Sequence, residues 1–143
     1  MDQKLVEDTL AKLDKHMNPA AQIALNPRDE ELTDMVQLLT DSKLKRKRKI
    51  ALLGSYILLY TALRSHRLID TREESATLNR ELLDGDYLFG AYIRWLVDAE
   101  DSDLLSFLTP VHKRIQIQFT EGMSLQDAMA ELLDQYRHYL FHS

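Results

Sequence analysis

Apolar residues recur at intervals of three and four along most of the chain, which is the spacing of amphipathic α-helices. No alternating pattern is long enough to predict a β-strand. Two clear stripes are Leu5, Val6, Leu10, Leu13 and Met17, and then Leu32, Met35, Val36 and Leu39. The pattern predicts helices over residues 2–17, 27–41, 43–63, 71–99, 103–109, 110–119 and 124–140. We therefore expect an all-α fold, a helical bundle.

Short polar signals mark the ends of these helices. Asn, Ser, Thr and Asp cap helix starts, and proline fits the first helical turn but not the interior. The start signals are Asn26-Pro27, Asp41-Ser42, Thr71–Glu74, Thr109-Pro110 and Ser124–Asp127; the stop signals are Asn18-Pro19, Asp41-Ser42 and Gly122. Residues 19–26 are expected to be a connector.

Two predicted helices are unusually apolar. Residues 50–63 are apolar nearly all round, which predicts a helix that is interior to a bundle or covered by another chain. Residues 82–97 carry two adjoining apolar faces, which predicts a core helix with one side open to something large. The first face is Leu82, Phe89, Ile93 and Leu96, and the second is Leu83, Tyr87, Ile93 and Val97.

Three residues inside the second apolar helix call for an explanation. Gly85 and Gly90 each cost about 1 kcal/mol relative to alanine within a helix, so each is expected to have a packing reason. Asp86 is a carboxylate among apolar neighbours, and we expect it to be paired or to face a wet cleft.

Composition narrows the class of protein. A chain of 143 residues, 45% hydrophobic, fits one domain over residues 1–143. The absence of cysteine excludes disulfides and favours a cytoplasmic location. The apolar run 50–63 is shorter than the roughly 20 residues of a membrane span, so we expect no transmembrane segment, and the acidic N-terminus does not resemble a signal peptide. A net charge of −5 argues against general nucleic-acid binding.

A run of cations opens the third predicted helix. Its members are Lys43, Lys45, Arg46, Lys47, Arg48 and Lys49. Cations at a helix N-terminus are unfavourable by about 0.3–1 kcal/mol each, so these side chains should spread into water or meet an anion. Two interpretations remain open: a solvated helix start, or a site for an anionic partner such as a diphosphate, an acidic protein surface or nucleic acid.

No complete catalytic or metal site is evident from the residues. His138 and His142 have a spacing that zinc can use, but a third ligand is not evident. Residues 98–103 hold several carboxylates, which we interpret as a solvated loop. The sequence also has no phosphate-binding glycine loop, so we expect neither a metal nor a cofactor in this chain.

Two segments resemble the trans-type polyprenyl diphosphate synthases. They are Ala-Leu-Arg-Ser-His-Arg-Leu-Ile-Asp at 62–70 and Leu-Leu-Asp-Gly-Asp-Tyr-Leu at 82–88. His66 and Asp70 match the first aspartate-rich motif of catalytic members, but Arg67 and Leu68 stand where carboxylates hold magnesium. Neither side chain can ligate magnesium, and the second aspartate-rich motif is absent.

This loss of acids is similar to the small, non-catalytic subunits of heterodimeric bacterial long-chain synthases. Arg64 and Arg67 replace acids, and the chain is short; both features are most like the hexaprenyl diphosphate synthase small subunit. The similar region spans residues 56–97. The resemblance implies part of the isoprenoid synthase fold and a larger catalytic subunit as partner, which would contain the magnesium. It also implies a prenyltransferase subunit, inactive alone, in quinone side-chain biosynthesis.

The resemblance further implies that this subunit lines the tunnel of the growing prenyl chain and helps to set its length. Interface or tunnel candidates are Tyr56, Gly85, Asp86, Tyr87, Phe89, Tyr92 and Ile93. The four aromatic residues among them are candidates for the tunnel floor, with ordinary core packing as the alternative for each. From a different class, the competing hypothesis is a helical adaptor or nucleic-acid-associated protein that uses the basic run 43–49.

Overall fold

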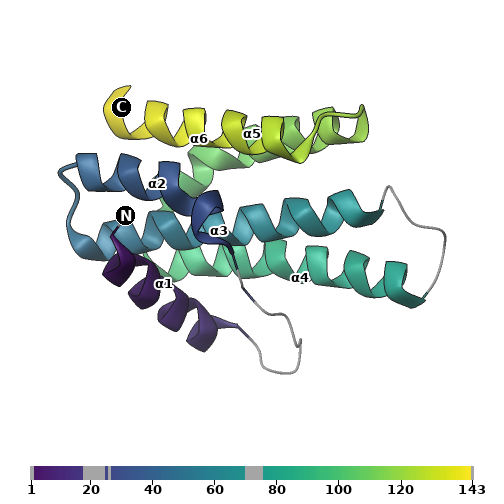
Figure 1. Ribbon diagram of the computed structural model, residues 1–143, viewed down its shortest axis with the longest axis horizontal. Helices are drawn as coiled ribbons and strands as arrows, with labels where there is room; N and C mark the ends of the chain where they lie inside the picture. The colour runs from purple at the N-terminus through teal and green to yellow at the C-terminus, as the bar shows by residue number, and fades with distance from the viewer. Residues whose placement is uncertain (1, 18–24, 26, 70–75, 143) are drawn as a thin grey trace.

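The chain forms an all-helical structure in the computed structural model, which describes residues 2–17, 25, 27–69 and 76–142 (Figure 1). Residues 66–69, 76–86 and 142 are described by their backbone alone. No strand occurs in the described part of the chain. The helices are α1 (Gln3–His16), α2 (Asp29–Asp41), α3 (Arg46–Ile69), α4 (Ala76–Asp98), α5 (Ser102–Thr120) and α6 (Leu125–His142).

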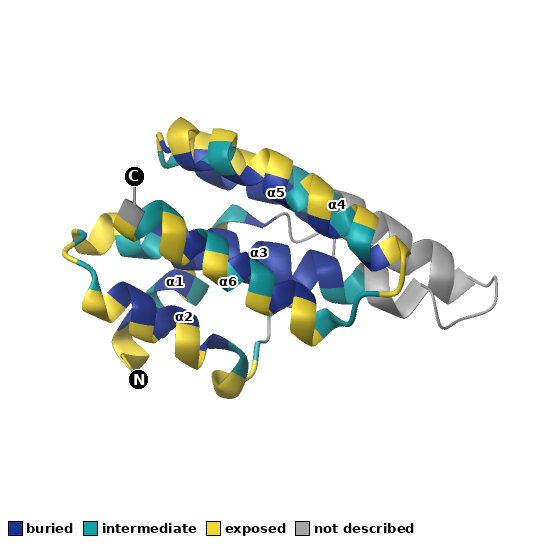
Figure 2. Ribbon diagram, turned by 90° about the horizontal axis from the view of Figure 1, so that it is seen from above, coloured by how far each residue is buried: buried dark blue, intermediate teal, exposed yellow. Residues whose placement is uncertain are grey.

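Helix α3 is the central element. It pairs along its length with α4, the most extensive helix–helix contact in the molecule, and it also contacts α1, α2 and α6 (Figure 1). Every residue from 51 to 63 is buried, which explains why this stretch is apolar all round (Figure 2). Of the two positions expected for it, the interior of the bundle is therefore the correct one.

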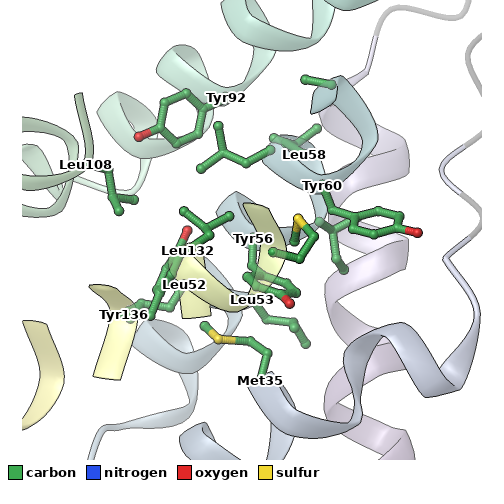
Figure 3. Packing of buried hydrophobic residues seen from close by; sticks show 14 of the residues in the cluster. Met35, Leu52, Leu53, Tyr56, Leu58, Tyr60, Tyr92, Leu108, Leu132 and Tyr136 are labelled. Atoms are coloured by element: carbon green, nitrogen blue, oxygen red, sulfur yellow. The ribbon is translucent and has the colours of Figure 1, made fainter. Parts of the chain in front are cut away.

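The core lies where α3 meets the other helices. In Figure 3, Tyr92 and Leu58 lie on one side of the cluster and Met35 on the other, with Leu53 and Tyr56 between them. The predicted stripes of α1 and α2 are confirmed, because all their members except the half-buried Leu10 are buried. In α6, the residues at helical spacing that are buried in the core are Met129, Leu132 and Tyr136.

Two predicted helix starts were too early. Helix α2 begins at Asp29 with Arg28 at the N-cap, and not at Asn26-Pro27; Asn26 lies outside the described residues. The Glu31 carboxylate accepts a hydrogen bond from the Arg28 backbone N–H at 3.2 Å, which fixes the start. Helix α3 begins at Arg46 and not at Lys43, because Ser42 ends α2 with an extended backbone.

The prediction of two helices divided at Pro110 was wrong. Helix α5 runs without a break from Ser102 to Thr120 with Pro110 inside it. Proline in a helix interior usually costs about 3 kcal/mol. A buried stripe continues on both sides of it and is the packing that opposes this cost; its members are Leu104, Leu108, Val111, Ile115 and Phe119.

The predicted end of the third helix was too early, because α3 continues past residue 63 to Ile69. Two other helix starts lie within one residue of their predicted positions, and each has a capping side chain. Asp2 caps α1, and the Ser124 hydroxyl accepts a hydrogen bond from the Asp127 N–H at 3.0 Å. The predicted capping box at 71–74 and all of the connector 19–26 except residue 25 lie outside the described residues, apart from the start of α4 at Ala76.

Helices α4 and α5 end in the same type of turn. In each, the residue two positions after the helix has a positive φ: Glu100 at 56° and Gly122 at 105°. After α4, the Asp101 N–H donates to the Leu96 carbonyl at 2.9 Å; after α5, the Met123 N–H donates to the Gln118 carbonyl at 3.0 Å. These are Schellman turns, in which glycine is the favoured residue at the positive φ. Only the second turn has glycine there.

Replacing Glu100 with glycine is therefore expected to stabilise the fold by about 0.5–1 kcal/mol, because a side chain is strained at this φ. Urea unfolding followed by circular dichroism measures the change. The matched control is Gly122→Ala, which is expected to destabilise the fold. A loss of stability in Glu100→Gly would show that the glutamate side chain stabilises the turn by more than its backbone strain.

Gly54 leaves the space in which the Trp95 indole of α4 packs against α3. A Cβ atom placed there would lie only 2.2 Å from Cζ2 of Trp95. The Trp95 indole N–H donates to the carbonyl of Ala51 at 2.8 Å, one turn before Gly54. The sequence had indicated Gly85 and Gly90 as the glycines with a packing role, and not Gly54. Gly90 needs no such explanation, since its Cβ would meet only the mobile end of Arg94, and the side-chain surroundings of Gly85 are not described.

Candidate functional site

One cavity of about 660 Å³ lies between α1, the start of α3 and the turn that joins α4 to α5. This volume falls within the range of small-molecule sites. We call it the basic cavity. Its lining residues are Lys12, Lys15, His16, Lys45, Lys47, Arg48, Ile50, Ala51, Trp95, Asp98, Ala99, Glu100 and Asp101.

The basic run of α3 divides into three groups. Lys45, Lys47 and Arg48 line the basic cavity, whereas Lys43 and Lys49 do not. Arg46 turns to α1, where its guanidinium lies 2.9 Å from the Asp8 carboxylate and, by this hydrogen bond, lowers the pKa of Asp8. The run is therefore not a uniformly solvated helix start, because half of its members line a concave site.

The acidic segment 98–103 is largely exposed, as predicted for a solvated loop, but Asp101 is an exception. Asp101 is only 7% exposed, and its carboxylate accepts two hydrogen bonds at 3.3 Å from the Arg48 guanidinium. The same carboxylate accepts the Leu104 N–H and so caps α5. Arg48 also donates to the Tyr139 hydroxyl of α6 at 2.9 Å. One buried carboxylate therefore joins the start of α3 to the start of α5.

The opposite wall of the basic cavity comes from α1 and α4. His16 Nε2 lies 3.0 Å from the Ala91 carbonyl oxygen, so this nitrogen carries the proton and donates it. The His16 ring packs edge-on against Trp95 at 5.4 Å, and its Nδ1 lies 3.8 Å from the Asp98 carboxylate. The contribution of α1 to this cavity was not predicted from the sequence. The sequence does contain an indication of it, because Lys12, Lys15 and His16 recur at helical spacing on the polar face of α1.

Four cations of the basic cavity have no carboxylate within 4 Å among the described side chains. They are Lys12, Lys15, Lys45 and Lys47. With histidine neutral, the lining holds five cations and three carboxylates, an excess of two positive charges in a chain whose net charge is −5. Positive charge is therefore concentrated at this site against the overall sign of the molecule.

Two of the predicted interface or tunnel residues belong to the core. Tyr56 and Tyr92 are 4% and 3% exposed and pack within the buried cluster (Figure 3). Burial raises the pKa of both hydroxyls above their ordinary value. The Tyr92 hydroxyl is buried and finds no hydrogen-bond partner among the described residues. In the described structure these two side chains therefore pack in the core, and their role toward a product chain stays a prediction.

The other candidates lie toward the outside of α4. Tyr87 and Phe89 are half-buried, Tyr87 beside the Arg94 guanidinium and Phe89 against the His112 ring. Ile93 is 48% exposed, and Val97, one turn later, is 57% exposed. Both belong to the two predicted apolar faces of this helix, and Ile93 was also an interface candidate; they are exposed because the inward face of α4 is formed by Leu88, Ala91, Tyr92, Trp95 and Leu96. Gly85 and Asp86 lie in α4, and only their backbone is among the described parts of the chain.

The described side chains include no group of three His, Cys, Asp or Glu residues placed to hold a metal ion. His138 stacks on the Phe107 ring at 6.2 Å, and the side chain of its proposed zinc partner His142 is not described. Among the helices described, none has both the length and the apolar character required to cross a membrane.

Comparison with protein-family models, with curated proteins and with solved structures found no match for this chain.

Proposed function

We propose that this chain is the non-catalytic subunit of a heterodimeric polyprenyl diphosphate synthase, which elongates farnesyl diphosphate with isopentenyl diphosphate. It stabilises a larger catalytic subunit and helps to set the length of the product, a hexaprenyl chain for quinone side chains. The magnesium and the reacting groups belong to the larger subunit. The proposal rests on the resemblance of two sequence segments together with the surface described below.

The two segments belong to the most extensively packed pair of helices. Residues 62–69 end α3, residues 82–88 lie in the first half of α4, and the two helices run antiparallel along each other. The segments therefore lie toward the same end of one helix pair. Within them, Arg67 and Leu68 replace the carboxylates of the catalytic family, which is consistent with a supporting subunit.

The observation that carries the proposal is the exposed apolar line on α4. Ile93 and Val97 are about half exposed on the helix that carries the second resembling segment. The helical register places Gly90 on the same line, one turn before Ile93. Large aliphatic side chains in a row on an exposed helix face are typical of a protein-binding surface. We call Ile93 and Val97 the α4 outer face.

The core positions of Tyr56 and Tyr92 narrow the residues that can limit the product chain. Both face the interior of this chain, whereas Tyr87 and Phe89 are only half-buried on α4. We therefore keep Tyr87 and Phe89 as the residues that contact the product at the subunit interface. Shortening either to alanine should lengthen the product of the assembled enzyme.

The decisive experiment is reconstitution with a catalytic subunit from the same organism, a larger chain with two Asp-Asp-x-x-Asp motifs. Both chains are mixed with magnesium, farnesyl diphosphate and isopentenyl diphosphate, and the prenyl products are analysed by chromatography. We expect long-chain product only from the mixture. Product from this chain alone, or a mixture that neither associates nor changes the activity of the larger chain, would contradict the proposal.

Charge placed on the α4 outer face is expected to disrupt this association. Val97→Asp should weaken binding to the catalytic subunit at least tenfold, because a central apolar contact typically contributes about 2 kcal/mol. Surface plasmon resonance measures the affinity. The matched control is Ile117→Asp on α5, where the side chain is 55% exposed but lies on another helix. Equal weakening by both variants would place the interface elsewhere.

A further inference from the structure

We propose that the basic cavity binds a small organic molecule through a phosphate or diphosphate group. The site is independent of the α4 outer face, and the inference holds whether or not the chain pairs with a larger subunit. Its residues come from three separate parts of the sequence: α1, the start of α3 and the end of α4 with the following turn.

The cationic side of the cavity fits a compact anion with more than one negative charge. Lys12 and Lys15 approach from α1, and Lys45 and Lys47 from the start of α3. None of the four has a carboxylate within 4 Å among the residues that the structure describes. Like charges gathered around one concavity repel each other, and a multivalent anion between them removes that repulsion. A phosphate group has the charge and the acceptor oxygens to meet several ammonium groups together.

Arg48 has a different role at the same site. Its guanidinium is held by Asp101 and by the Tyr139 hydroxyl, so its position is fixed from two sides. It lines the cavity without being free to reorient, and its charge is balanced by the Asp101 carboxylate. The lysines are the mobile groups that would close on the anion, and Arg48 is part of the rigid wall behind them.

Part of the remaining lining is apolar and suits an organic group attached to the phosphate. Ile50, Ala51, Trp95 and Ala99 form this side. The cavity volume of about 660 Å³ exceeds what a free phosphate ion would fill and is that of a small-molecule site. The exposed carboxylates Asp98 and Glu100 in the lining disfavour a long polyanion that would run across the opening. The geometry therefore favours a small phosphorylated molecule over nucleic acid.

The chain supplies its own reporter for this site. Trp95 is the single tryptophan of the sequence, and it lines the cavity. Titration with inorganic pyrophosphate at low ionic strength should change its fluorescence with saturation at one site. Isothermal titration calorimetry then gives the stoichiometry and the affinity. Phenyl phosphate, compared with inorganic phosphate, tests the apolar side and should bind more tightly.

The basic run offers a matched pair of variants. Lys45→Met with Lys47→Met removes two cations of the cavity, and Lys43→Met with Lys49→Met removes two cations of the same run outside it. The first pair should lower pyrophosphate affinity at least tenfold and the second by less than threefold. Glu100→Gln should tighten binding, because it removes a carboxylate from the rim. Far-UV circular dichroism confirms that each variant remains helical.

Three outcomes would overturn the inference. The first is an unchanged signal at millimolar pyrophosphate. The second is equal weakening by the two lysine pairs, which would reflect the general charge of the run. The third is tighter binding of single-stranded RNA or DNA than of pyrophosphate, with an affinity that falls steeply with salt, which would identify a nucleic-acid surface.

Discussion

Replacing Gly54 with alanine is expected to lower the free energy of unfolding by about 2–4 kcal/mol, although alanine is the better helix former. The new methyl group would lie within 2.7 Å of three Trp95 atoms: Cζ2, Cε2 and Nε1. Trp95 is 6% exposed and also packs against the His16 ring, so it has little room to move. Displacing it would also break the hydrogen bond that its indole donates to Ala51.

A double-mutant cycle isolates this contact from other effects of the substitution. In a Trp95→Leu background the indole atoms are absent, and alanine at 54 should be neutral or stabilising by up to about 1 kcal/mol. Gly90→Ala on α4 is the matched control, because its Cβ would meet only the end of the Arg94 side chain at 3.2 Å. Urea denaturation provides all the values. If Gly54→Ala were as mild as Gly90→Ala, α3 and α4 would not depend on this close approach.

Ser55→Ala is expected to destabilise the fold by about 1–2 kcal/mol, and more than Tyr136→Phe does, although both remove the same hydrogen bond. The two hydroxyl oxygens lie 2.6 Å apart at fully buried positions. The serine hydroxyl donates its one proton to the Leu52 carbonyl, so the hydrogen between the two oxygens is donated by Tyr136. Burial raises the pKa of Tyr136 well above its ordinary value, so this donor stays protonated at all working pH values.

The asymmetry follows from what each variant leaves behind. Without Ser55, the Tyr136 hydroxyl is buried with no acceptor; without the Tyr136 hydroxyl, Ser55 keeps its bond to Leu52. The double variant should therefore be about as stable as Tyr136→Phe alone. Thermal unfolding of the three variants measures this order. The opposite order, with Tyr136→Phe the more damaging, would contradict the assignment of the donor.

The sequence predicted the positions of the helices better than it predicted which elements pack against each helix. A repeating stripe reports which face of a helix is buried, and this was sufficient for α1, α2 and α6. It does not report what covers that face. Ile93 and Val97 fit an apolar stripe as well as Leu96 does, yet only Leu96 faces α3. When an apolar stripe is wider than the area that neighbouring helices cover, the pattern of one helix cannot distinguish its core positions from its exposed apolar positions.

Local rules failed where distant residues decide the outcome. Pro110 has the usual signature of a helix start, but the buried stripe on both sides holds α5 together. Asp101 belongs to a segment that reads as a solvated loop, and only its meeting with Arg48, 53 residues away, buries it. For the same reason half of the basic cavity was visible in the run 43–49, whereas its other cations depend on how α1 packs against α3.

The two-sided attachment of Arg48 gives the molecule a mechanical property. A single guanidinium holds Asp101 at the beginning of the α5–α6 hairpin and Tyr139 near its end. A displacement of the first turn of α3 is therefore transmitted through Arg48 to the start of α5 and to the last part of α6. Arg48 and Tyr139 are 91 positions apart in the sequence. The α5–α6 hairpin cannot tilt away from α3 as a rigid body without breaking the hydrogen bonds from Arg48 to Asp101 and Tyr139.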